Sequence, residues 1–302
     1  MEPDRRGETS LPEGALSKVT AVLRRMQFLD RRYIYLFFFI FVVASHFFEF
    51  RWPIAASKAT KGVYDTVESL PSDKVIVIDS DWGAGIKPEA EGQLRALLRH
   101  VMQRRLKFII LSWTQNPEGQ KFGMDVAADV ARDFGYEYGT DWCALAAITR
   151  ASGATIAALA KDIHDTAETD IYGTSLNDAD RLPMMQQVRD IYDVGLIFQI
   201  GYGHEITPWM GFVQGVYGTK YGVGVSAISS STAYSYVESG QMCGMMAGAP
   251  GAAEYEELLD LPREKRFARK PVNVLSMAIV YILLMMVLGN IAYLSSMGKV
   301  ER

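Results

Sequence analysis

Residues 74–85, KVIVIDSDWGAG, decide the fold of this chain. The first half, KVIVI, is a continuous run rich in β-branched residues, which predicts a strand that is buried on both faces. Such a strand belongs to a parallel sheet with helices packed on both sides. The second half turns polar at once, with Asp79, Asp81 and two glycines, and predicts a loop at the carboxyl end of that strand.

Short apolar runs alternate with helical periodicity along the middle of the chain. The runs at 107–111 (KFIIL), 194–200 (VGLIFQI) and 223–228 (VGVSAI) predict further strands. This alternation predicts an α/β fold, a doubly wound and mostly parallel Rossmann-like sheet whose strands all end at one rim, where ligands of such sheets bind. We also expect helices at 62–70, 89–105, 117–134, 153–163, 182–192, 208–217, 231–238 and 252–259, short strands at 142–148 and 242–247, and a loop at 165–181.

Two apolar stretches flank this region. Residues 33–50 (YIYLFFFIFVVASHFFEF) and residues 272–294, which contain no charged side chain, are each long enough to cross a hydrocarbon core as a helix. They predict an N-terminal and a C-terminal transmembrane helix, with the Rossmann-like domain at 53–261 between them. A basic amphipathic tail at 1–32 and a short C-terminal tail at 295–302 complete the chain.

The charges around the two spans favour opposite orientations. The tail before the first span carries seven Lys+Arg, which favours a cytoplasmic N-terminus, whereas the basic stretch at 263–270 precedes the second span. We give more weight to the first span, because a basic tail is harder to translocate than a basic flank attached to a large domain. We therefore expect a two-pass protein of the inner (cytoplasmic) membrane, with cytoplasmic termini and an extracytoplasmic α/β domain.

Composition narrows the classes of partner. Between the spans, residues 53–271 carry 21 Lys+Arg against 28 Asp+Glu, and an acidic domain argues against nucleic acid as a partner. The lipid bilayer, other membrane subunits or further copies of this chain are the partners that we expect. Cys143 and Cys243 allow one disulfide, but neither lies in a CxxC or Cys/His cluster, so buried free thiols are the favoured interpretation.

The first candidate site is the loop after the 74–78 strand. Asp79 and Asp81 stand two residues apart, a spacing that can hold Mg²⁺ in phosphoryl-transfer enzymes, and Trp82 follows them. A contact with a small ligand and a purely structural turn are the two alternatives. The glycines here form neither a GxGxxG nor a Walker motif, and the sequence predicts no cofactor.

Two further candidates follow later strands. In 201–205 (GYGHE), Tyr202 and His204 can contact a ligand, His204 is a possible general base, and Glu205 can favour a helix start. In 226–234 (SAISSSTAY), Ser229 and its neighbouring hydroxyl groups suit either an anion or a helix N-cap. The chain has no GxSxG motif, which disfavours a serine hydrolase.

Four stretches together resemble a family of uncharacterised prokaryotic membrane proteins. They are YDTVESLP, VIVIDSD, LRHVMQRRLKFIILS, and VSAISS followed by Y-x-Y-x-ESGQM-x-G-x-MAGAPGAAEYE. Members of that family have one span at each end and a Rossmann-like domain between them. The resemblance covers roughly residues 60–295, implies this architecture and no catalytic residue, and does not include the long basic tail.

Three functions remain open on the sequence. The first is a non-catalytic, membrane-anchored subunit or scaffold of a larger membrane assembly, because no catalytic set is complete. The second is an extracytoplasmic domain that binds or senses a small ligand at the rim. The third is a metal-dependent enzyme that uses Asp79, Asp81 and His204, which requires these side chains to lie within one coordination shell.

Overall fold

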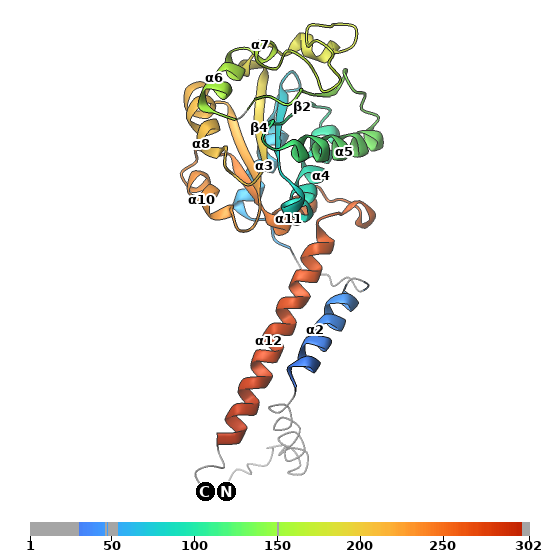
Figure 1. The fold of residues 1–302 in the computed structure, drawn as a ribbon, viewed down its shortest axis with the longest axis vertical. Helices are drawn as coiled ribbons and strands as arrows, with labels where there is room; N and C mark the ends of the chain where they lie inside the picture. Colours follow the sequence, from blue (N-terminus) through green and yellow to red (C-terminus); the bar gives the residue numbers. More distant parts are fainter. Residues whose placement is uncertain (1–29, 46, 48–53, 150, 298–302) are drawn as a thin grey trace, which may run out of the picture. The chain divides into compact units, whose positions relative to one another are not determined.

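The computed structural model describes residues 30–45, 47, 54–149 and 151–297. The chain divides into two compact units (Figure 1). One is an α/β unit, Trp52–Val272, and the other is a helical unit made of Met1–Arg51 and Asn273–Arg302. Almost all of the predicted tail at 1–32, and the end of the predicted first span, lie outside the described residues.

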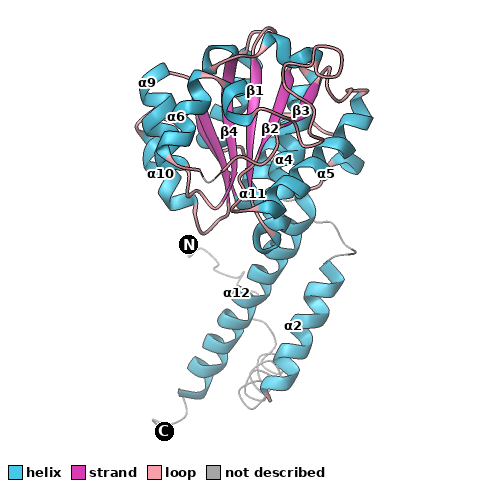
Figure 2. Cartoon of the chain, turned by 45° about the horizontal axis from the view of Figure 1, so that its top comes forward, coloured by secondary structure: helices cyan, strands magenta, loops and turns pink. Residues whose placement is uncertain are grey.

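The α/β unit contains a six-stranded sheet in the order β3-β2-β1-β4-β5-β6, and every neighbouring pair is parallel (Figure 2). The predicted Rossmann-like class is therefore confirmed. The strand order reverses between β1 and β4, so the switch point lies at the middle of the sheet. The strands are β1 (Val75–Asp81), β2 (Lys107–Leu111), β3 (Trp142–Ala144), β4 (Val194–Gly201), β5 (Lys220–Val225) and β6 (Gly244–Ala247).

Side chains of β1 alternate between two cores, one on each face of the sheet. Ile76 and Ile78 belong to the core that is covered by α3 (Lys58–Ser69), α4 (Lys87–Gln103), α5 (Pro117–Phe134) and α11 (Gly248–Leu258). Val75 and Val77 belong to the opposite core, which helices from the later half of the unit cover. These are α6 (Gly153–Lys161), α7 (Ile163–Ala167), α8 (Ile206–Trp209), α9 (Gly215–Tyr217) and α10 (Ser230–Glu238).

Local signals set some of the helix ends. The Ser57 hydroxyl accepts a hydrogen bond from Thr60 N at the start of α3, and Gly135 ends α5 in the left-handed conformation with φ 66°. The predicted helix at 208–217 is present, but its middle is a π-helical turn, Met210–Gln214, between α8 and α9. The predicted strands at 142–148, 223–228 and 242–247 are shorter or shifted, as the bounds above show.

The helix predicted at 182–192 is wrong. The segment forms two 3₁₀ turns instead, η2 (Pro183–Gln187) and η3 (Ile191–Asp193). The imidazole of His164 lies within hydrogen-bonding distance of the carbonyl oxygens of Met185 and Val188, at 3.1 and 2.8 Å. Met185 O also accepts from Val188 N at 3.3 Å, an i+3 bond that closes a 3₁₀ turn in place of the i+4 bond of a continuous helix.

The helical unit contains α2 (Arg31–Ser45) and most of α12 (Arg269–Met297). The two helices run antiparallel, since Asn273 Nδ2 donates to Ser45 O at 3.1 Å and Tyr281 OH donates to Ile34 O at 2.9 Å. Within α12, residues 269–294 have a mean hydropathy of 2.4 over the best 18-residue window, of which 11 % is buried. Among the described residues this is the one helix long and apolar enough to span a membrane.

Candidate functional site

Three carboxyl groups gather at the switch point of the sheet. Asp79 and Asp81 belong to the end of β1, and Glu205 follows β4, the strand that pairs with β1. They are 0, 3 and 4 % exposed, respectively. Acidic side chains are rarely buried without partners, because removal of a charge from water costs several kcal/mol. The partners of these three groups therefore decide what the site can do.

Asp79 is held between two indole rings. Its Oδ1 accepts from Trp113 Nε1 and its Oδ2 accepts from Trp209 Nε1, both at 2.8 Å. The two rings are fully buried and lie 6.2 Å apart, on the face of the sheet opposite α4 and α5. Burial raises the pKa of Asp79 well above its usual range, and the nearby Asp81 and Glu205 raise it further. With both oxygens bonded in the core, Asp79 serves as a structural anchor.

Asp81 and Glu205 form a buried acid pair. Asn116 Nδ2 donates to Asp81 Oδ1 at 3.1 Å, and Gln199 Nε2 donates to Glu205 Oε2 at 2.7 Å. Burial raises the pKa of Glu205 to about 8, and the Asp81 carboxyl adds to this by charge repulsion and a hydrogen bond. Two close carboxyl groups cannot both ionise readily. At neutral pH Glu205 therefore keeps its proton.

A hydrogen-bonded chain continues from Glu205 into the sheet. Tyr221 OH donates to Gln199 Oε1 at 2.6 Å, while the amide of Gln199 donates to Glu205. Gln115 Nε2 donates to the other oxygen of Glu205 at 3.3 Å. Gln199 lies within β4, Tyr221 near the start of β5, and Gln115 in the segment after β2, so this network links β4, β5 and that segment.

Two loop amides at the rim are bonded to carboxylates of the chain itself. Ala84 N, in the loop after β1, donates to Glu118 Oε2 at 2.8 Å, and Ala227 N, after β5, donates to Glu89 Oε2 at 2.9 Å. In Rossmann-like folds the loop after the first strand is a common place for a ligand phosphate. Here a glutamate takes that position, so this rim is unsuited to an anionic ligand.

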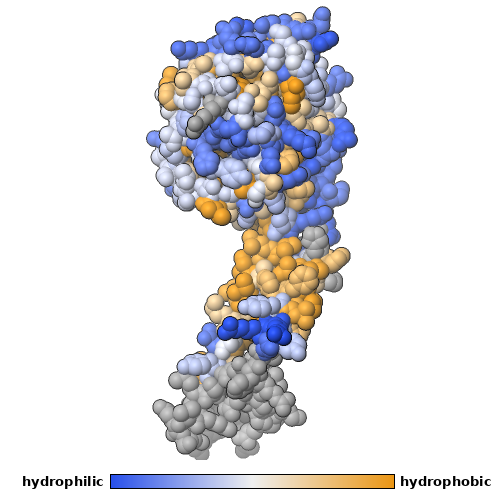
Figure 3. Space-filling view, viewed as in Figure 1, coloured by the Kyte–Doolittle hydropathy of each residue, from blue (hydrophilic) through white to orange (hydrophobic). Residues whose placement is uncertain are grey.

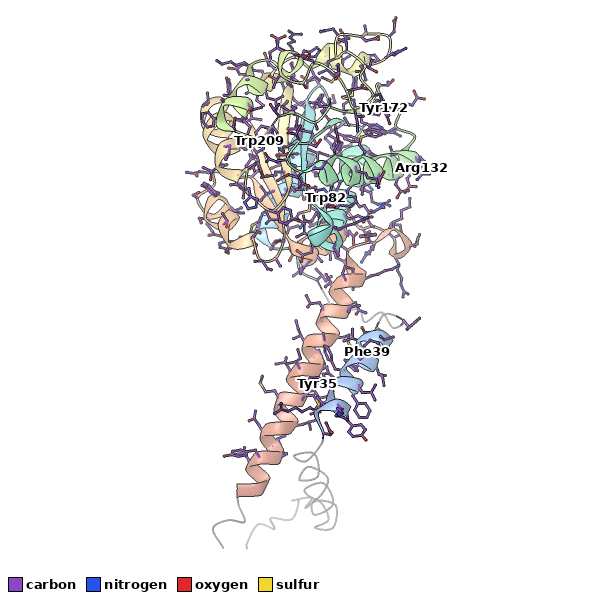
Figure 4. The ribbon with its side chains drawn as sticks, viewed as in Figure 1. Tyr35, Phe39, Trp82, Arg132, Tyr172 and Trp209 are labelled. Carbon is purple, nitrogen blue, oxygen red and sulfur yellow. The ribbon has the colours of Figure 1, made fainter. Side chains whose placement is uncertain are left out.

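The remaining predicted residues are dispersed around the rim. Trp82 is fully buried on the other face, 5.1 Å from Phe122 between ring centroids, and its Nε1 has no partner among the described residues. Tyr202 is half-buried and stacks on the exposed His204 at 6.1 Å. Figure 4 labels Trp82 and Trp209, the indoles that lie on opposite faces.

Ser229 lies after β5 and bonds within its own loop. Its Oγ accepts from Ser226 Oγ at 3.1 Å, and it makes no side-chain cap bond to α10. Of the two alternatives for the serine run, N-capping by Ser229 itself is therefore absent. Instead, the Oγ of Ser226, three residues earlier, accepts a hydrogen bond from Ser229 N at 3.4 Å. Glu205 likewise does not cap α8, because its side chain turns into the buried network.

The structure brings Asp79 and Asp81 together with Glu205, and does not bring His204 to them. His204 is exposed while both aspartates are buried, and no hydrogen bond joins it to either among the described residues. In the same part of the chain, no group of three or more His, Cys, Asp or Glu side chains is arranged to hold a metal ion. Cys143 and Cys243 are both free, as predicted.

Sequence reasoning missed the residues that satisfy the buried acids. Trp113 and Trp209 come from positions 34 and 130 residues away from Asp79, so no local pattern announces them. One signal was available, because Gln199 is a polar residue inside an otherwise apolar strand. Comparisons with family models, with curated proteins and with solved structures found no match to this chain.

Proposed function

We propose that this chain is a non-catalytic, membrane-anchored subunit that presents an α/β domain at a membrane surface. The observation that carries this proposal is the surface of α12. Large apolar side chains are exposed all along its length, from Leu275 at 52 % to Leu294 at 66 %. The helical unit is accordingly mostly apolar in the view of Figure 3. A helix that is apolar on all sides and not covered by protein fits a lipid environment.

The pairing of α2 with α12 supports a two-pass arrangement. The described part of α2 is also apolar and exposed, with Tyr35 at 67 % and Phe39 at 64 % (Figure 4). Tyr281 packs against Phe38 and Phe41 at 5.3 and 5.6 Å, and its hydroxyl bonds a backbone carbonyl of α2. Interhelical polar contacts and aromatic packing hold neighbouring membrane helices together. We keep cytoplasmic termini and an extracytoplasmic domain as the proposed orientation in the inner membrane.

The non-catalytic part of the proposal rests on the rim. Asp79 uses both oxygens for indole donors, and the acid pair of Asp81 and Glu205 is buried and bonded. A general base or metal ligand must reach its substrate, and these groups face the interior. The resemblance to two-span proteins with no assigned activity agrees with a role in an assembly.

A second candidate function, the binding of a small cationic ligand, is favoured by the charge of the rim. Glu89 and Glu118 already hold the loop amides that an anion would need, and Asp81 lies at the end of β1. A thermal-shift screen of amines against anions of equal size tests this function. A stabilising amine that is lost in Glu118→Gln supports it, and stabilisation by phosphate compounds contradicts it.

The anchoring claim is tested by membrane extraction of the full chain. The wild type is expected to stay in membranes washed with alkaline carbonate, and a C-terminal reporter is expected to lie in the cytoplasm. Ile282→Lys with Met286→Lys places two charges at the centre of α12, each costing about 3 kcal/mol for insertion, and should move the reporter across the membrane. Ile228→Lys with Tyr172→Lys, two exposed positions of the α/β unit, is the matched control. A wild type that carbonate removes contradicts the proposal.

The assembly claim needs a separate experiment. After mild detergent extraction from its native membrane, the chain is expected to co-purify with stoichiometric partners, either other subunits or copies of itself. A clean monomer in several mild detergents contradicts the role as a subunit while leaving the membrane anchor intact.

A further inference from the structure

The segment that leads into α12 is strongly basic. Residues 263–270, REKRFARK, contain five Lys+Arg and one Glu. They form the 3₁₀ turn η5 (Arg263–Lys265) and the start of α12, and all belong to the α/β unit. The apolar run of α12 begins two residues later, at 272. The last two residues of this segment, Arg269 and Lys270, are therefore in the first turn of α12, just before its apolar run.

A hollow of about 460 Å³ lies between this segment and α4. Its lining is cationic and aromatic, with Glu264 as the one acidic residue in it. Proline side chains, Pro88 and Pro271, complete the wall. The residues that can contact a ligand by charge or by an aromatic ring are Arg95, Arg99, Lys265, Arg266, Phe267 and Lys270.

The three arginines of the hollow are fixed in place. Their side chains are 17, 11 and 18 % exposed for Arg95, Arg99 and Arg266, respectively. Each guanidinium donates hydrogen bonds to protein partners through Nη1, and those of Arg95 and Arg266 also through Nε. In each of the three, the Nη2 atom has no hydrogen-bond partner within the described ranges. The partners are Glu91 and Asp129 for Arg95, Asp133 for Arg99, and Glu257 with Leu261 O for Arg266.

The wall opposite α4 is equally well ordered by its contacts. The buried carboxylate of Glu256 accepts from Phe267 N at 2.7 Å and from Ala268 N at 3.0 Å. The Arg95 guanidinium lies 5.1 Å from the centre of the Phe267 ring. Lys265 and Lys270 are exposed, and no ion pair holds either within the part of the chain described. Three arginines held in place by protein partners and two lysines without an ion pair in the part of the chain described thus line one small hollow.

We propose that this hollow binds the phosphate group of an anionic phospholipid headgroup. Guanidinium groups match phosphate oxygens in geometry, and lysines add charge without a fixed direction. Basic residues at the end of a membrane helix bind anionic headgroups in the same way. The position of Lys270 and Pro271 on α12 itself favours a lipid over a free phosphate, which is the other source of this chemistry. The inference rests on the proposed membrane anchor.

The test uses the full chain in neutral detergent micelles, with native mass spectrometry to count bound lipids. Short-chain phosphatidylglycerol and phosphatidylcholine are titrated in parallel, because both carry a phosphate and only the first is anionic. Wild type is expected to retain one phosphatidylglycerol about tenfold more tightly than phosphatidylcholine. Lys265→Gln with Lys270→Gln should abolish this tenfold preference, since each lysine near an anionic headgroup contributes about fivefold and the two together contribute more than tenfold.

Two controls keep the test decisive. Lys121→Gln with Lys161→Gln removes the same charge from exposed positions elsewhere on the α/β unit and should leave lipid retention unchanged. Arg99→Lys keeps the charge but removes the planar fork, so it should weaken retention severalfold without changing the melting temperature of the unliganded chain by more than a few degrees. Equal loss in the lysine control, or no preference for the anionic lipid, overturns the proposal.

Inorganic phosphate distinguishes the two sources. If inorganic phosphate displaces phosphatidylglycerol at a concentration similar to that of the lipid, the hollow is a free-phosphate site. The lipid proposal is then overturned. Failure here is separable from failure of the anchor. A chain that stays in carbonate-washed membranes but shows no headgroup preference contradicts this site only, whereas a chain that binds the lipid in micelles but is washed from membranes contradicts the anchor.

Discussion

Replacement of Glu205 by glutamine probes the acid pair at the switch point. The pKa of Glu205 is about 8 in the fold, against 4.5 for an exposed glutamate. Between these values the folded chain keeps a proton that the unfolded chain has released. Stability from this group is therefore fully present below about pH 4.5 and is lost as the pH rises through about 8. Glutamine mimics the protonated acid and removes this dependence.

The expected size follows from the linkage of one proton. Within the window between the two pKa values, the free energy of unfolding falls by about 1.4 kcal/mol per pH unit. Between about pH 5.5 and about pH 7.5 the loss from Glu205 amounts to about 2.5 kcal/mol. Asp79 has a raised pKa as well and contributes a slope of the same sign in both proteins. Because the Glu205 charge also raises the pKa of Asp79, the difference between the wild-type and Glu205→Gln slopes reports Glu205 together with its effect on Asp79.

Urea unfolding in neutral detergent micelles, followed by fluorescence of the buried tryptophans, measures these slopes. Glu205→Gln should be more stable than wild type at pH 7.5, with a flatter pH profile. The amide of Gln115 can rotate to present its oxygen to the new amide group, so the network keeps its donors and acceptors. Glu238→Gln, an exposed glutamate at the end of α10, is the control. Identical pH slopes for wild type and Glu205→Gln would refute the raised pKa of Glu205.

Three further changes test the core and the helix pair. Trp113→Phe leaves Asp79 Oδ1 without its donor and should cost about 1–3 kcal/mol in urea unfolding; an unchanged midpoint contradicts the anchor role. Gly201→Ala drives a methyl group into the backbone at the end of β1, so we expect a loss of about 1–3 kcal/mol by the same assay, and neutrality would show that β4 can shift there. Tyr281→Phe removes the bond to Ile34 O and should weaken the α2–α12 pair by about 0.5–2 kcal/mol, read as faster proteolysis of α2 in micelles; wild-type rates would rule out this contact as a clamp.

Much of the fold could be predicted because burial imposes a pattern on the strands. A strand such as 74–78 that is covered on both faces must be apolar throughout, and the structure places it at the centre of the sheet. The segment at 182–192 escaped this reasoning, since two of its carbonyl oxygens bond the ring of His164, which lies outside the segment. Periodicity describes local preference, and a distant hydrogen bond can override it.

The candidate site shows the same division. The positions of Asp79 and Asp81 at the end of a parallel strand follow from the sequence, and they do lie at the switch point. The chemistry of those carboxyl groups does not follow, because it depends on Trp113, Trp209 and Glu205. A carboxylate with free oxygens suggests a metal ligand, and the same residue between two indole donors is an anchor. Only tertiary contacts distinguish these cases.

The central claim, a membrane-anchored subunit, is tested most directly by the mass of the particle that contains this chain. Extraction from the native membrane into lipid nanodiscs, followed by native mass spectrometry, reports that mass without detergent dissociation. We expect a particle of defined stoichiometry, heavier than one chain of 33.6 kDa with its lipids. A particle that contains one copy alone, or a chain that is found free of the membrane, would contradict it.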